Sequence, residues 1–192
     1  MSFLTGTQAE LLYTLPATLT KNTYTTEAAF TGVAGTNTLP AIPAGFFLND
    51  NPNPVGRALH YKAMGTIGNT AAATFAINLG LDSTAGTKAN ATAVMTATAP
   101  PVAAGAPWFL DAYFTCTAFA TTTYTLQVTG QFRMESSNGG AAGSGPLCTG
   151  FSASITGLVP TTQYFIELFG TWSASNAANT TTLQQVFLWG LN

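Results

Sequence analysis

Charge is the property that this sequence has least of. Charged residues make up 6% of the 192 residues, five Lys or Arg and seven Asp or Glu, whereas a globular chain typically carries roughly 25%. Five cations are too few to neutralise a phosphate backbone, which excludes strong nucleic-acid binding. One histidine and seven carboxylates leave little material for catalysis. We therefore expect no enzyme, no cofactor and no metal site.

Long apolar runs and a basic N-terminal region are missing as well. The sequence has no run of about 18 consecutive apolar residues, which excludes a transmembrane helix. Met1–Thr5 has no basic region of the kind that begins a signal peptide. Cys116 and Cys148 lie far apart and lack the spacing of metal ligands. We expect no signal peptide, no membrane segment and two free thiols.

What the sequence does have is a period-two alternation of apolar and polar residues, which is typical of half-buried strands. In the clearest case, Leu126, Val128 and Phe132 alternate with threonine, glutamine and Arg133. The same pattern predicts eight strands, with shorter ones near Leu39 and Phe151. These strands are expected over residues 23–31, 55–67, 74–81, 91–99, 108–119, 124–135, 163–172 and 183–191.

Helical signals are nearly absent, and glycine, proline and asparagine gather between the predicted strands. We therefore predict an all-β fold, a single antiparallel β-sandwich of jelly-roll type over residues 21–192. An extended N-terminal arm over residues 1–20 is expected to precede it. An immunoglobulin-like sandwich is the alternative, but the Cys…Trp…Cys spacing of that fold is missing.

Three groups of residues could carry chemistry, and each has a plainer interpretation. His60 could act as a general base, but a histidine on a strand surface is the commoner case. Asp111 and Glu167 could face one another as a hydrolase pair, although the same could be said of any two acids. Asn49–Asn53 holds one carboxylate among its oxygens, which favours a plain loop over a calcium site.

An exterior with so few charges is tolerated when partners cover it or when it forms part of a larger particle. Trp108, Trp172 and Trp189 are aromatic residues of the kind enriched at interfaces. We expect at least two of these three tryptophans to fill the core. The composition thus favours a subunit of an assembly over a free monomer.

Several segments carry a resemblance to known proteins. They are Thr25–Phe30, Val55–Gly65, Thr74–Leu81 and Trp108–Tyr113, followed by the most characteristic run, Thr171–Asn176 through Asn179–Thr182 to Gly190–Asn192. From about residue 25 onward the chain resembles a family of small β-rich structural proteins encoded by tailed phages of actinobacteria. Its members are described as capsid decoration, minor capsid, head-fibre or minor tail proteins. The resemblance implies a virion component, assembled in the host cytoplasm and without a catalytic motif.

Capsid decoration is the function expected first, with a homotrimer that binds the major capsid protein or another virion protein and stabilises the head. The alternative is a head-fibre or minor tail protein that binds host-surface glycans, and a virion glycan hydrolase comes third. Under the first hypothesis, deletion of residues 1–16 abolishes capsid binding and leaves the trimer folded. The residues expected at these contacts are Phe3, Leu4, Leu11, Leu12 and Tyr13 in the arm and Trp172, Phe187 and Trp189 between subunits.

Overall fold

The computed structural model describes residues 9–15, 17–22, 25–26, 28–30, 39–47, 54–68, 73–85, 92–99, 105–134 and 147–191. These residues form twelve strands and no helix, so this part of the chain has no helix that could cross a membrane. The strands are β1 (Ala9–Thr14), β2 (Leu19–Asn22), β3 (Ala28–Ala29), β4 (Ala41–Ile42), β5 (Ala58–Gly68), β6 (Phe75–Asp82), β7 (Thr92–Ala99), β8 (Ala106–Phe119), β9 (Tyr124–Met134), β10 (Leu147–Leu158), β11 (Tyr164–Trp172) and β12 (Thr180–Leu191).

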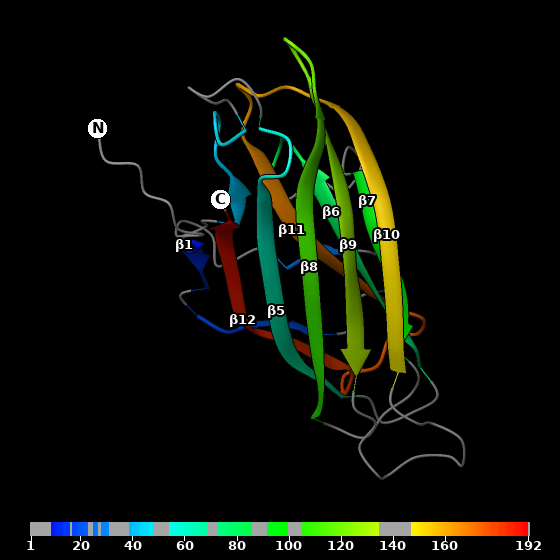
Figure 1. The fold of residues 1–192 in the computed structure, drawn as a ribbon. Coiled ribbons are helices and arrows are strands. Elements are labelled where there is room, and N and C mark those ends of the chain that lie inside the picture. Colours follow the sequence, from blue (N-terminus) through cyan, green and yellow to red (C-terminus); the bar gives the residue numbers. More distant parts are fainter. Residues whose placement is uncertain are drawn as a thin grey trace.

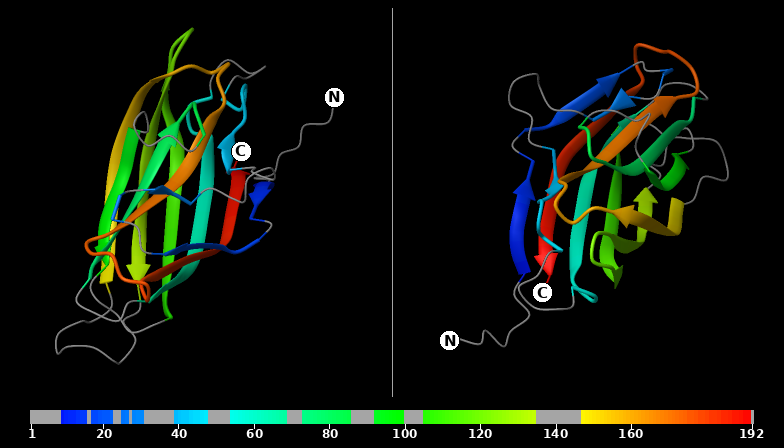
Figure 2. Two further views of the ribbon diagram at one scale, coloured as in Figure 1. Left: turned by 180° about the vertical axis from the view of Figure 1, so that it is seen from behind. Right: turned by 90° about the horizontal axis from the view of Figure 1, so that it is seen from above.

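Two antiparallel sheets pack face to face (Figure 1). The seven-stranded sheet has the order β1-β12-β5-β8-β9-β10, with β2 also paired to β12. The five-stranded sheet has the order β3-β11-β6-β7, with β4 also paired to β11. Figure 2 shows the same two layers from behind and from above. The predicted all-β antiparallel sandwich is confirmed.

The path of the chain alternates between the sheets, as it does in the double Greek key of a jelly roll. It crosses from β5 to β6, from β7 to β8, from β10 to β11 and from β11 to β12. Between two of these crossings β8, β9 and β10 follow one another in the same sheet, so β9 and β10 extend the seven-stranded layer at one side. The jelly-roll type stays an interpretation of this order.

The core lies between the sheets and follows the predicted alternation. In β8 every second side chain is buried, from Trp108 through Leu110 and Phe114 to Cys116. In β9 the buried set contains Leu126 and the other apolar residues of the predicted face. Since successive side chains of a strand point to opposite faces, the residues between them lie on the outer face of the sheet.

The N-terminal segment differs from the expected arm. Of its described residues, Ala9–Thr14 pairs with β12 as the edge strand β1, and Leu19–Asn22 pairs with the other half of β12 as β2. The register shifts between Leu11 and Tyr13, which leaves Leu12 as the extra residue of a β-bulge. Leu12 and Tyr13 consequently both pack against the core. The segment pairs with the sheet because this position buries the side chains of Leu12 and Tyr13 against the core.

Both cysteines are free, as predicted, and their surroundings differ. Cys116 is buried, and burial raises the pKa of its thiol, whereas Cys148 is exposed. Because the thiolate is the reactive species, we expect Ellman's reagent to titrate one thiol per native chain rapidly and the second only in denaturant. Cys148→Ser should remove the fast reaction. Two equally fast thiols in the native protein would contradict this placement.

Candidate functional site

The outer face of the seven-stranded sheet is the candidate site, because aromatic side chains stand there where a solvated strand normally carries polar ones. The strand register brings them into one row across four strands. Leu11 of β1 lies opposite Trp189 of β12, Trp189 lies opposite His60 of β5, and His60 lies opposite Tyr113 of β8. Phe187 precedes Trp189 by two positions on the same face. We call these five residues the aromatic row.

Within the aromatic row the rings cover one another's faces. The rings of His60 and Tyr113 are stacked, with centroids 4.2 Å apart and planes 10° from parallel. Trp189 lies 5.4 Å from His60 on the neighbouring strand and stacks on Phe187 at 5.2 Å. Stacked neighbours on a sheet turn their faces toward each other, so the row presents mainly ring edges to the outside.

Exposure of the row is uneven, and its two ends are the most open parts. Leu11 is 53% exposed and Tyr113 is 41% exposed, while Phe187, Trp189 and His60 are half-buried. A partner that covers such exposed apolar side chains gains roughly 25 cal/mol of binding free energy per Å² of apolar area that it buries. The row is therefore a surface suited to contact with another molecule.

A small polar cluster borders the row. Nε2 of His60 lies 2.7 Å from Oδ1 of Asp111, and Nζ of Lys62 lies 3.6 Å from Oδ2 of the same carboxylate. Asp111 is opposite Lys62 in the sheet register and next to His60 on the diagonal. The carboxylate thus orients the imidazole for stacking on Tyr113 and is itself held in place by two partners.

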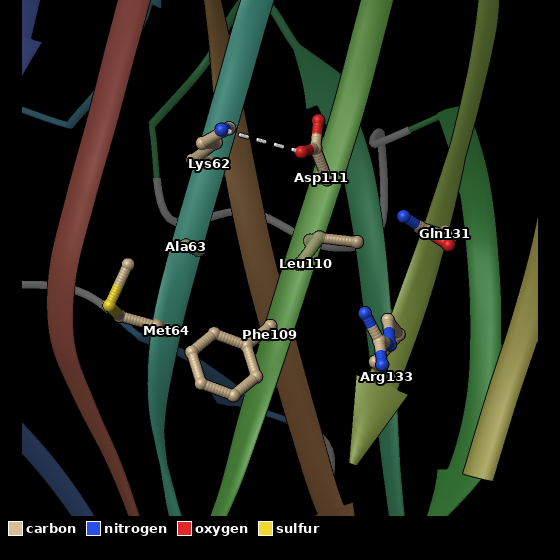
Figure 3. A pocket seen from close by; sticks show the side chains of 8 residues that line it. All are labelled: Lys62, Ala63, Met64, Phe109, Leu110, Asp111, Gln131 and Arg133. Atoms are coloured by element: carbon tan, nitrogen blue, oxygen red, sulfur yellow. Dashed lines mark ion pairs between the residues drawn. The ribbon is translucent and has the colours of Figure 1, made fainter.

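Beside this cluster lies a shallow depression of about 230 Å³. Its outward-facing walls come from three neighbouring strands and form two cross-strand rows, Met64–Phe109–Arg133 and Lys62–Asp111–Gln131. Figure 3 shows the ring of Phe109 nearly face-on to a viewer who looks onto the outer face of the sheet. Phe109 is 41% exposed, and no described aromatic ring stacks on it, in contrast to the rings of the aromatic row.

The predicted contact residues fall into three groups. Leu11, Phe187 and Trp189 lie together in the aromatic row, although the sequence assigned Leu11 to a separate arm. Trp172 is only 2% exposed and packs on Phe75 with ring centroids 4.8 Å apart, so it belongs to the core. The others lie away from the row: Leu12 and Tyr13 pack toward the core, and Phe3 and Leu4 lie outside the described residues.

The groups considered for chemistry are also placed. His60 lies on a strand surface, as its plainer interpretation held. Asp111 is on the outer face of the seven-stranded sheet, while Glu167 is buried in the other sheet on the side of β11 opposite Ile166, so the two carboxylates do not face one another. The whole of Asn49–Asn53 lies outside the described residues. Among the part that is described, no three His, Cys, Asp or Glu side chains lie close enough to hold a metal ion.

Phe109, Tyr113 and the stacking role of His60 were missed by sequence reasoning. A signal for them exists in Trp108–Phe119, where aromatic residues occupy both faces of the predicted strand. Trp108 and Phe114 lie at even positions and face the core, whereas Phe109 and Tyr113 lie at odd positions and face outward. An aromatic residue on the polar side of an alternating strand is therefore the informative pattern.

Comparisons with known proteins add little to this description. No family model matches the chain, and no curated protein matches it. Among solved structures, the chain is similar to the CBM2 module of the evolved Dit of Lactobacillus casei BL23 phage J-1. The sequence identity is 10%, the similarity covers 97% of each chain, and the TM-score is 0.33. A similarity this low supports no inference about ligand or function.

Proposed function

We propose that this chain is a structural protein of a tailed-phage virion, and specifically a capsid decoration protein that docks through its aromatic row. The resemblance of its sequence segments to phage virion proteins motivates the first part. The observation that supports docking is the row itself, five apolar or aromatic side chains aligned across four strands of the seven-stranded sheet.

The stacking within the row favours a protein partner over a sugar. A sugar ring binds an aromatic side chain by lying on its face, and the faces of His60, Tyr113, Trp189 and Phe187 are turned toward one another. Ring edges and the side chain of Leu11 instead fit into pockets between the side chains of another protein surface. Tryptophan and tyrosine in such positions often contribute most of the binding energy.

The proposed mechanism is bridging between neighbouring capsid subunits. A decoration protein that buries this face across two subunits adds contacts that must break before the subunits separate. The row itself contains no Asp, Glu, Lys or Arg side chain, so its burial desolvates no such charge, while Lys62 and Asp111 lie at its border. The homotrimer, expected by analogy with jelly-roll proteins of virus particles, belongs to this proposal, since a trimer presents three rows to the particle. The mass of the purified protein in solution tests it.

Co-sedimentation with capsids that lack the protein tests the docking surface. We expect Trp189→Ala to weaken capsid binding roughly 30-fold, equivalent to about 2 kcal/mol, because it removes the central ring of the row. Phe109→Ala, on the same face but outside the row, serves as the matched control and should bind as the native protein does. If Trp189→Ala sediments with capsids as tightly as the native protein, the aromatic row is not the docking surface.

The second candidate function, glycan binding by a head-fibre or minor tail protein, has its own supporting observation in the ring of Phe109. That ring lies outside the row, is turned outward and is bordered by Met64 and by four polar side chains (Figure 3). Binding of the native protein to purified host cell walls, in place of capsids, would favour this second function.

A further inference from the structure

We infer that the depression around Phe109 is a binding subsite for a single pyranose ring that carries an anionic group, a carboxylate or a phosphate. The inference goes beyond capsid docking and does not depend on it, since the two surfaces use different residues of the same sheet face. Four features of the depression carry it: its floor, its rim, its charge and its size.

The floor is the ring of Phe109, which comes from β8 and lies with its face outward (Figure 3). The face of an aromatic ring carries partial negative charge. One side of a pyranose ring presents several C–H bonds, which are apolar and carry partial positive charge, so that side stacks on an aromatic face. Stacking would also cover a side chain that is 41% exposed. In the aromatic row, by contrast, the rings of His60, Tyr113, Phe187 and Trp189 each have a face covered by a neighbouring ring.

The rim supplies hydrogen-bonding groups on the sides where the hydroxyl groups of a stacked sugar lie. Asp111 and Lys62 stand beyond one edge of the Phe109 ring, and Gln131 and Arg133 stand on the neighbouring strand β9 (Figure 3). An ionised carboxylate offers about four acceptor positions, so Asp111 can accept from sugar hydroxyls while it holds His60 and Lys62. The amide of Gln131 both donates and accepts.

The charge of the depression selects an anionic ligand. Lys62 and Arg133 are two cations against the one carboxylate of Asp111, so a positive charge is left over. Lys62 already pairs with that carboxylate, whereas Arg133 forms no ion pair with any described residue. The planar guanidinium group presents a fork of donors that matches a carboxylate or a phosphate. Arg133 is therefore the residue that would hold the anionic group.

The size of the depression limits the ligand to one ring. Its volume of about 230 Å³ is below the roughly 300–1,000 Å³ of pockets that enclose drug-sized ligands. Two rows of three side chains on adjacent strands span about 10 Å by 7 Å, from the usual strand spacings. A longer glycan would then make further contacts outside the depression, along the sheet face.

The test uses three probes that differ only in the group attached to C5 of the pyranose ring: methyl β-D-glucuronide, methyl β-D-glucoside 6-phosphate and methyl β-D-glucoside. Binding to the full-length protein is followed by calorimetry and by NMR titration of the side-chain amide of Gln131. We expect at least one anionic probe to bind with a dissociation constant on the order of 1 mM, a value in keeping with the modest free energy per atom of small ligands. The neutral glucoside should bind roughly tenfold more weakly.

Substitutions at two positions identify the groups responsible. Phe109→Ala should abolish measurable binding of all three probes, while Phe109→Tyr, which keeps the ring, should retain it. Arg133→Gln should weaken the anionic probe roughly tenfold and leave the glucoside unchanged. The matched control is Tyr113→Ala, since Tyr113 lies on the same strand and face with the same 41% exposure but belongs to the aromatic row.

The outcomes separate this subsite from capsid docking. Probe binding that is lost in Phe109→Ala and kept in Tyr113→Ala supports the subsite, whether or not the protein sediments with capsids. No saturable binding of either anionic probe, or binding that survives in Phe109→Ala, overturns it. Equal affinity for the glucoside and the anionic probes overturns the role of Arg133. Comparison of the glucuronide with the glucoside 6-phosphate shows which anionic group is preferred.

Discussion

Replacing Gly65 with alanine is expected to lower the free energy of unfolding by about 4 kcal/mol, among the largest effects of any single substitution. A Cβ at this position would overlap the backbone carbonyl oxygen of Thr182 and lie 3.0 Å from the indole of Trp108. The close approach lies beside the point where the register of β12 with β5 shifts, between Leu183 and Gln185. Backbone atoms on one side and a fully buried indole on the other leave the new methyl group no space.

Gly150→Ala is the matched control, because Gly150 is also a strand residue of the seven-stranded sheet. The nearest atom to a Cβ there is the carbonyl oxygen of Gly130 at 3.9 Å, an ordinary contact. The free energy of unfolding of the Gly150→Ala variant should stay within about 0.5 kcal/mol of the native value. Urea denaturation followed by circular dichroism measures both variants. Equal stability of the two would mean that β5 and β12 do not approach as described.

Trp172→Ala is expected to cost about 3–5 kcal/mol of stability, the usual effect of removing a large buried aromatic side chain. Trp172 is 2% exposed and lies opposite Phe75 of β6, with ring centroids 4.8 Å apart. Its loss would leave a cavity between β11 and β6 that rigid neighbouring side chains fill only in part. A cost of this size is a large share of the roughly 5–15 kcal/mol that stabilises a typical domain.

Trp189→Ala is the control for a tryptophan on the surface. Trp189 stacks on Phe187 and lies near His60, so its loss should reduce stability by only about 1 kcal/mol while it weakens capsid binding. Both tryptophans were predicted at subunit contacts. We now expect Trp172→Ala to lower mainly the stability and Trp189→Ala to weaken mainly capsid binding. If Trp172→Ala proved as stable as Trp189→Ala, Trp172 would not be the core residue described above.

The alternation of apolar and polar residues predicted most of the fold because burial imposes a period of two on a sheet with one wet face. Strands β5, β6, β7, β8, β9, β11 and β12 lie close to their predicted ranges. Strand β10 was expected only as a short element near Phe151, since serine and glycine occupy the outward positions and the inward ones include Thr149 and Ala153. Those residues fit the edge of a sheet but produce a weak hydrophobic pattern.

The candidate site was harder to predict than the fold. Phe187 and Trp189 could be proposed from the sequence because aromatic residues are frequent at interfaces. Nothing in a single sequence shows that Leu11 lies opposite Trp189, or that Phe109 and Arg133 come together, because these neighbours depend on strand order and register. The bulge at Leu12, which turns two predicted arm residues inward, likewise depends on pairing with β12.

The division of the outer edge of β12 between two short strands affects how a shortened chain would behave. Ala9–Thr14 covers Phe187–Leu191, and Leu19–Asn22 covers Thr180–Leu183. Deletion of residues 1–16 would strip the first of these covers and leave a row of unpaired peptide groups, which is a template for another chain to add a strand. Such a protein is expected to polymerise edge to edge and also lacks Leu11 of the aromatic row, so its failure to decorate a capsid would not identify a docking contact made by the expected arm. A chain that starts at Ala9 keeps β1 and therefore a closed edge. Such a chain tests whether residues 1–8 contribute to capsid binding.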